Sequence, residues 1–393
     1  MKKLFFNLFT GTILISLLTL TSCKSNDKND PIDVLIEQGV LYGTLEHEAT
    51  LDASKVYSLT GTLVIADGGV LTIPAGTKIK AQEGFGSYIL VAQGGKINVN
   101  GTAANPVIMT AADETNAASG YWGGLVINGR AKISGTTGVT ATSSCEMNTE
   151  YIYGGTNDAD NSGNITYLMI KYAGARSSAE VEHNGLTLDA VGNGTTIENI
   201  YILESADDGI EFFGGTVNVK NLLVVNSDDD MFDNTQGYRG ALTNCYGIWE
   251  KGFTSSESDP RGVESDGNLD GKTPEDANQT DFSITNMTID IKLDPATTAD
   301  KILQDVVKIR RGAKANIVNA LIKGTGTVQD LADCTDSKGD AATGTIIDLT
   351  NLLISPITGS EKKVGTNNAA ITISTSNTGC NTSIFSWTGY TGF

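Results

Sequence analysis

The sequence predicts an all-β chain wound into a right-handed parallel β-helix, because short strands, a 22-residue repeat and a recurrent asparagine occur together. Glycine accounts for 45 of the 393 residues and proline for only 7, and no long segment shows a helical period. Segments such as "SYILVAQGGKINVNG" and "WGGLVINGRAKISG" alternate apolar and polar residues and end in turn residues. We therefore expect many short strands.

Two adjacent segments repeat each other at a constant offset of 22 residues. "TIENIYILESADDGIEF" from Thr196 aligns with "NVKNLLVVNSDDDMFDN" from Asn218, so that Asn199 matches Asn221. A period of this length, built of short strands, is typical of a solenoid, and we expect three short strands in each coil. The right-handed winding follows from the general rule for parallel connections.

An asparagine followed by the pattern apolar, any, apolar recurs along the chain. Asparagine tolerates the left-handed backbone region that a sharp bend between two strands requires. Stacked coils place equivalent side chains about 4.8 Å apart, so their amides are expected to hydrogen-bond along the solenoid axis. The pattern occurs at Asn199, Asn221, Asn244, Asn286, Asn319 and Asn351.

The amino-terminal segment has the features of an export signal followed by a lipid anchor. Lys2 and Lys3 precede an apolar stretch over residues 4–20. The sequence Leu-Thr-Ser-Cys that ends at Cys23 resembles the lipobox of bacterial lipoproteins, so residues 1–22 are interpreted as a signal peptide and Cys23 as the lipidated residue. Residues 23–31 are polar and are interpreted as a flexible tether. A lipid anchor holds a protein on a membrane without spanning it.

The rest of the chain is divided into a solenoid and two caps, because the open ends of a solenoid are unpaired edges. Residues 32–55 are expected to cap the first coil, residues 56–375 to form the β-helix, and residues 376–393, rich in aromatics, to cap the last coil. Four cysteines lack the close spacing of a zinc site and are interpreted as structural or unpaired, with any disulfide pairing left open. They are Cys145, Cys245, Cys334 and Cys380.

The chain is strongly acidic, with a formal charge of −19, which becomes −21 (−19 − 2) when Lys2 and Lys3 leave with the signal peptide. Such a surface repels nucleic acid and anionic membranes. It favours cations, cationic partners or neutral sugars, and we expect a monomer that does not bind nucleic acid.

Two acidic turns, "ESADDGIEFFGG" and "NSDDDMFDNTQG", occupy equivalent places in consecutive repeats. With one coil per 22 residues, Asp207 stacks near Asp229 and Asp208 near Asp230. Carboxylates about 5 Å apart repel each other by roughly 1–4 kcal/mol per pair. A bound cation or raised pKa values must relieve this repulsion.

The strand after each acidic turn carries one outward acid. In "GIEF" the two apolar residues point inward, so Glu211 points outward, and Asp233 is its equivalent in the next coil. The following coils place Glu264 and then Lys308 or Arg310 at this position. The outer face is therefore expected to present acid, acid, acid and base in order.

The acidic turns predict a calcium site. Oxygen ligands from short acidic segments suit Ca²⁺ better than a transition metal. The alternative is a solvated turn in which aspartates cap backbone amides. The predicted ligands are Asp207, Asp208, Asp229, Asp230 and Glu211.

Several phrases resemble those of a large family of Bacteroidetes outer-membrane lipoproteins, among them "LTIPAGTKIKA", "GKINVNGTAANPVIMTA", "YWGGLVING", "NGLTLDAVGNGTTIENIYI", "DDGIEFFGGTVNVKNL" and "GVESDGN". The resemblance extends from about Val56 to Leu321 and is most specific from Asn184 to Asp233. It implies a right-handed parallel β-helix anchored to the outer membrane. The cell surface is the expected location, with the periplasmic face as the alternative that the sequence leaves open. It supplies no catalytic residue.

Binding of a glycan is the first function that we expect of this face. Sugar faces stack on exposed aromatic rings, and Tyr201, Tyr238, Tyr246 and Trp249 are expected at or near outward positions beside the acids. The predicted ligand-binding residues are Tyr201, Glu211, Asp233, Tyr238, Trp249 and Glu264.

A polysaccharide-cleaving enzyme is the alternative. Asp207, Asp229 and Asp230 match the spacing of the acids in polygalacturonase-type hydrolases, but the later segment "YGIWEKGF" lacks the histidine of that family. A lyase would need Ca²⁺ and a base, for which Arg239 is one candidate. A third possibility, allowed only by the resemblance, is an accessory to a TonB-dependent transporter. The candidate catalytic residues are Asp208, Asp230, Glu211, Asp233, Lys308 and Arg310.

Overall fold

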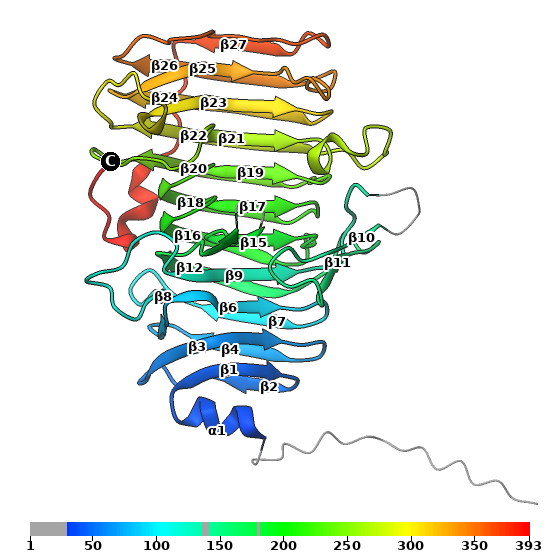
Figure 1. Cartoon of the computed structure of the whole chain (residues 1–393), viewed down its shortest axis with the longest axis vertical. Helices are drawn as coiled ribbons and strands as arrows, with labels where there is room; N and C mark the ends of the chain where they lie inside the picture. Colours follow the sequence, from blue (N-terminus) through cyan, green and yellow to red (C-terminus); the bar gives the residue numbers. More distant parts are fainter. Residues whose placement is uncertain (1–29, 136–140, 179–180) are drawn as a thin grey trace, which may run out of the picture.

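The computed structural model describes residues 30–135, 141–178 and 181–393, and these form the parallel β-helix that the sequence predicts (Figure 1). Among the described residues, twenty-three strands join one sheet, in which each coil hydrogen-bonds to the next by parallel ladders. The apolar side chains that point inward fill one continuous core along the axis. The predicted leader, most of the tether and the lipidation site at Cys23 lie outside the described residues.

The large sheet contains β1 (Val40–Leu45), β2 (Glu48–Thr50), β3 (Val56–Ile65), β4 (Val70–Pro74), β5 (Lys78–Ala81), β6 (Gly84–Val91), β7 (Lys96–Asn100), β8 (Val107–Ala111), β9 (Trp122–Asn128), β12 (Gly163–Lys171), β15 (Leu186–Asp189), β16 (Thr196–Ser205), β17 (Ile210–Phe213), β18 (Asn218–Ser227), β19 (Phe232–Thr235), β20 (Ala241–Trp249), β21 (Arg261–Asp266), β22 (Asp281–Ile291), β23 (Ile302–Arg310), β24 (Lys314–Gly324), β25 (Thr327–Asp333), β26 (Ile346–Leu353) and β27 (Ala370–Ser374). Two hairpins stand outside it, β10 (Thr142–Ser144) with β11 (Ile152–Gly154) and β13 (Arg176–Ser178) with β14 (Val181–Glu182). The helices are α1 (Pro31–Glu37) and the 3-10 turns η1 (Leu269–Gly271), η2 (Ala299–Lys301) and η3 (Thr382–Thr388).

Each central coil has three straight segments, as predicted. β16 bends at Asn199, where φ is 59°, and β17 follows after the acidic turn. The pairing of β16 with β18 matches Ile200 with Leu222 and keeps the 22-residue offset. The bend is possible because asparagine adopts the left-handed region at little cost.

The bend asparagines form a column. Asn221 donates to Asn199 at 2.9 Å, Asn244 donates to Asn221 at 2.9 Å, Asn286 donates to Asn244 at 2.9 Å, and Asn319 donates to Asn286 at 2.7 Å. The chain spacing between neighbours is 22, 23, 42 and 33 residues, so insertions lengthen the later coils without disturbing the column.

Asn351 does not join this column, contrary to the prediction. It pairs in register with Ile322, because the ladder between β24 and β26 shifts register between Ile317 and Ala320. Its side chain instead accepts a local hydrogen bond from the Leu353 N–H at 3.0 Å. The recurrent sequence pattern therefore identifies a bend only where the register is kept.

Both predicted caps differ in the structure. The amino-terminal cap is shorter than residues 32–55, because β1 already pairs with β3, and among the described residues α1 precedes this first coil with Asp30 as its N-cap. The carboxy-terminal segment 376–393 covers a flank of the solenoid beside β16, β18 and β20, whereas β27 lies at the end (Figure 1). The flank needs a cover because Tyr201, Leu223 and Tyr246 point outward there.

The four described cysteines are buried and free, which agrees with their interpretation as unpaired. Within the described ranges, no helix has the length and apolar character needed to cross a membrane.

Candidate functional site

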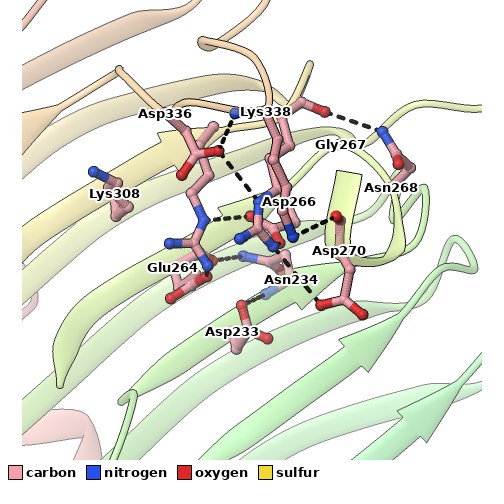
Figure 2. A network of polar contacts seen from close by, with 12 residues as sticks. Asp233, Asn234, Glu264, Asp266, Gly267, Asn268, Asp270, Lys308, Asp336 and Lys338 are labelled. Carbon is pink, nitrogen blue, oxygen red and sulfur yellow. Dashed lines mark hydrogen bonds and ion pairs between the residues drawn. The ribbon is translucent and has the colours of Figure 1, made fainter. Parts of the chain in front are cut away.

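Two columns of polar side chains run along one face, at the acidic turns and the strands that follow them. The second column has the predicted order of acid, acid, acid and base, since Glu211 pairs with Asp233, Asp233 with Glu264, and Glu264 with Lys308. Figure 2 shows Asp233, Glu264 and Lys308 on this face. The first column contains Asp208, Asp230, Arg261, Asp305 and Asp330, and the second contains Glu211, Asp233, Glu264, Lys308 and Asp333.

Backbone and amide contacts fix the first acidic turn. Asp208 N–H donates to the Asn184 side chain at 3.1 Å, and the same Asn184 amide donates to Glu211 at 2.6 Å. Gly209 follows directly, and a Cβ there would lie 2.5 Å from Val224 Cγ1 and 2.8 Å from the Met231 carbonyl oxygen. Only glycine fits at this position, because the turn lies against the next coil.

The acids enclose a cavity of about 260 Å³ whose lining consists of ten carboxylates and two guanidinium groups. Six of the ten carboxylates come from the two coils that carry the acidic turns. One coil contributes Asp207, Asp208 and Glu211, and the next contributes Asp229, Asp230 and Asp233. The lining residues are Glu146, Glu182, Asp207, Asp208, Glu211, Asp229, Asp230, Asp233, Asp259, Arg261, Glu264 and Arg310.

Burial raises the pKa of six of the carboxyl groups in this cavity, and repulsion between neighbouring carboxylates raises it further. For Asp229 burial and Glu264 raise the pKa to about 7, against the opposing effect of Arg261. A raised pKa means that the protein does not offset the cost of burying the charged carboxylate. The pKa is raised well above the usual range at Asp207, Asp208, Glu211, Asp230 and Asp233.

Two of the aspartates that line the cavity, Asp229 and Asp230, each have a buried Oδ1 atom without a hydrogen-bond partner. Asp230 is only 3% exposed, its Oδ1 has no partner, and its Oδ2 lies 4.0 Å from Arg261 Nη1. In the described part of the chain, no ion pair includes Asp208, Glu211 or Asp233. Unpaired buried carboxylates are costly, so this end of the face requires protons or a cation.

Two sets of three carboxylates could hold such a cation. Within each set, one oxygen atom from each residue lies within 4.8 Å of the others, and Asp208 belongs to both sets. The sets are Asp207, Asp208 and Asp229, and Asp208, Glu211 and Asp233. The structure thus brings four of the five predicted ligands into these sets, and Asp230 lines the same cavity.

A third carboxylate set, Asp305, Asp330 and Asp333, lies beside positively charged side chains. Lys363 lies 2.8 Å from Asp330 and 3.1 Å from Asp333, and Lys308 lies 2.8 Å from Asp333. Lysine ammonium groups therefore supply at this end of the face the charge that the protein does not supply near Asp208.

The basic residues differ in their suitability as a catalytic base. Arg310 lines the cavity, where it pairs with Glu264 and, at 2.7 Å, with Asp266. Lys308 is held by Asp333 and does not line the cavity. Arg239 is also remote from it, since its guanidinium donates to the backbone oxygens of Ala277 and Gln279.

The expectation that aromatic rings are exposed beside the acids is wrong. Tyr238 and Trp249 point into the core, where Tyr238 stacks on Phe212 and Trp249 donates to the Ser227 carbonyl oxygen at 3.0 Å. Tyr201 and Tyr246 do point outward, but the carboxy-terminal segment buries them. These rings are not available for stacking on a sugar.

Several residues that line the cavity are not among those predicted from the sequence. Arg261 lies two residues before the inward Val263, at the place equivalent to Asp230, so extending the repeat alignment by one coil would have identified it. Glu146 lies between β10 and β11 and Glu182 lies on β14, in two hairpins outside the coils, and no period in the sequence marks them.

The fold and this cavity define a parallel β-helix protein with an acidic site on its outer face. The family model for a pectate-lyase like beta helix domain matches residues 43–391, and the chain belongs to this family. No curated protein and no solved structure matches the chain. The affiliation with Bacteroidetes lipoproteins stays a prediction.

Proposed function

We propose that the acidic cavity binds Ca²⁺ and that the Ca²⁺-loaded face binds an extracellular glycan. The observation that carries the proposal is the buried, unpartnered Oδ1 of Asp230 in a cavity lined by carboxylates. Ca²⁺ takes six to eight oxygen ligands in a flexible geometry. The two carboxylate sets that share Asp208 offer ligands of this kind.

The size of the cavity favours an ion and its water molecules over a sugar. Its volume of about 260 Å³ lies below the range of roughly 300–1,000 Å³ that is common for small-molecule pockets. The neighbouring set already has cationic partners, with Lys363 and Lys308 beside Asp330 and Asp333 and Arg261 Nε 3.4 Å from Asp305, so a cation is expected at the Asp208 end.

Titration calorimetry of chelator-treated protein with Ca²⁺ tests the proposal. We expect one or more saturable binding events, weaker binding of Mg²⁺, and a higher melting temperature in Ca²⁺. At a free Ca²⁺ concentration 100 times Kd, the free energy of unfolding should rise by about 2.7 kcal/mol. Absence of both binding heat and thermal stabilisation would rule out the site.

A polysaccharide lyase is the second candidate, because Arg261 and Arg310 line the same cavity and could face a Ca²⁺-bound uronate. Burial alone lowers the pKa of both groups, but the neighbouring carboxylates outweigh this effect and raise it above the usual range. A guanidinium that holds its proton so firmly is a poor base, which favours binding over catalysis. Formation of unsaturated sugar products from a uronate polysaccharide would favour the lyase.

We further propose that a lipid on Cys23 anchors the protein to the outer membrane, with the β-helix exposed at the cell surface. The lipobox-like sequence before Cys23 supports this location. Replacing Cys23 by Ala should move the protein from the membrane fraction to the soluble fraction. Protease added to intact cells should degrade the wild-type protein if it faces outward.

A further inference from the structure

A second and larger cavity adjoins the acidic one. Its volume is about 540 Å³, within the range of small-molecule pockets. It lies where Ala206 and Asp228 directly precede the acids Asp207 and Asp229 in the chain. The same two turns therefore contribute to both cavities.

Arg176 separates the two cavities. Its guanidinium lies 3.1 Å from Glu182, which lines the acidic cavity, and 3.3 Å from Asp228, which lines the larger one. It also pairs with Glu257. Because three carboxylates surround this one cation, the described lining of the larger cavity offers no free positive charge to an anionic ligand.

The wall formed by residues 251–260 is held in place by hydrogen bonds. Ser255 Oγ donates to the Asp228 carbonyl oxygen at 2.5 Å, and Ser256 N–H donates to Asp228 Oδ1 at 2.7 Å. The ring of Phe253 packs on Trp249, with 5.2 Å between the ring centroids. A wall fixed in this way loses little conformational freedom when a ligand binds.

The lining combines hydroxyl groups with one partly exposed aromatic ring. Ser119, Thr254 and Ser256 provide the hydroxyls, and Phe253 provides the ring. Ser119 donates to Glu204 and Ser256 donates to Asp228, so these two hydroxyls offer a ligand acceptor positions. A sugar presents the complementary surface, since its apolar face stacks on an aromatic ring while its hydroxyls exchange hydrogen bonds with polar groups.

We propose that this cavity binds a neutral sugar residue of the glycan that also contacts the Ca²⁺-loaded acidic cavity. The inference rests on the proposed function, and it specifies the ligand as a polysaccharide that contains neutral sugars. Phe253 is the stacking residue. Carboxylated sugars are disfavoured in this cavity because Asp228 lines it and Arg176 is fully paired.

The test is calorimetry of the full mature protein with four hexasaccharides, prepared from galactan, xylan, mannan and galacturonan, each in Ca²⁺ and in chelator. We expect at least one neutral hexasaccharide to bind. Phe253→Ala should weaken that binding by about tenfold or more, whereas Phe253→Tyr keeps the ring and should bind normally. Thr254→Trp, at an exposed position on the rim, should also block binding.

Ca²⁺ affinity is measured on every variant and should not change, because Phe253 and Thr254 do not line the acidic cavity. Binding of the galacturonan hexasaccharide alone, unaffected by Phe253→Ala, would overturn this inference and leave the proposed function intact. Failure of all four to bind would also overturn it. Neutral-sugar binding that depends on Phe253 but persists without any Ca²⁺ binding would support the cavity and refute the calcium proposal.

Discussion

The Oδ1 atom of Asp208 accepts a hydrogen bond of 2.9 Å from the backbone N–H of Asp230, one coil further along the solenoid. One oxygen of Asp208 thus holds two coils together, while the carboxylate also belongs to both sets of potential cation ligands. A single side chain therefore links the winding of the chain to the charge of the cavity.

Replacing Asp208 by Asn separates these two roles. The amide oxygen can still accept the hydrogen bond from Asp230, but the negative charge is lost. We expect the fold to be retained and the Ca²⁺ affinity to fall by about tenfold or more, as measured by titration calorimetry.

The matched control is Asp330→Asn, in the carboxylate set that lysine side chains already neutralise. This change should leave the Ca²⁺ affinity unaltered, although it removes the carboxylate partner of Lys363. Equal Ca²⁺ affinities for wild type and Asp208→Asn would contradict the assignment of the site.

The order of the acidic column was predictable because parallel coils keep equivalent residues in register. Glu211, Asp233 and Glu264 each follow an inward apolar residue, and alternation then fixes their direction. Glu146 and Glu182 were not predictable, since the segments that carry them obey no period.

The prediction that aromatic rings are exposed beside the acids is wrong for two physical reasons. Trp249 has the same inward parity as Cys245 on β20, so a strict alternation count would have placed it in the core. Tyr201 and Tyr246 have outward parity, but distant residues such as Phe385 cover them. Alternation along a strand gives direction, whereas exposure depends on what else folds onto that face.

The asparagine column predicts a specific loss of stability. Asn221 has φ of 58°, donates to Asn199 and accepts from Asn244. Asn221→Ala removes both hydrogen bonds and strains the backbone. We therefore expect the free energy of unfolding, measured in urea, to fall by about 2–4 kcal/mol. Asn221→Gly relieves the strain, so it should lower the free energy of unfolding by less than Asn221→Ala does.

Asn351→Ala is the control for this comparison. Asn351 lies outside the column, and its side chain accepts a local hydrogen bond from the Leu353 N–H. Its replacement should lower the free energy of unfolding by about 1 kcal/mol or less. A larger loss at Asn351 than at Asn221 would show that the column does not stabilise the solenoid.

His183 predicts a dependence of stability on pH. It is buried between Phe85 and Tyr88, and burial lowers its pKa to about 3, against the opposing effect of the hydrogen bond to the Phe85 carbonyl oxygen. In the unfolded chain its pKa is about 6.5, so between these values the unfolded state binds the extra proton. His183 therefore favours folding above pH 6.5, and as the pH falls toward 3 this contribution is lost, by roughly 5 kcal/mol at most.

Denaturation of wild type and His183→Gln across this pH range measures the effect. The buried carboxyl groups of the acidic cavity have raised pKa values and act with the opposite sign, so only the difference between the two proteins isolates His183. The wild-type protein should lose more stability than the variant as the pH falls. Parallel pH profiles would show that His183 does not titrate as its burial requires.

The carboxy-terminal segment predicts a local loss of packing when Phe385 is shortened. Phe385 is fully buried, meets Tyr246 edge-on at 6.5 Å and stacks on Phe393 at 6.0 Å. Phe385→Ala should cost about 3–5 kcal/mol of packing free energy. Because residues 376–393 lie on the flank and not within the coils, this loss should detach the segment before the solenoid unfolds.

Limited proteolysis of the Phe385→Ala variant should then cleave this segment first, and a hydrophobic dye should bind the uncovered Tyr201 and Tyr246. The control Ser386→Ala, at an exposed position, should change neither the proteolysis nor the dye binding. Simultaneous unfolding of the coils would instead mean that the flank cover belongs to the same cooperative unit as the core.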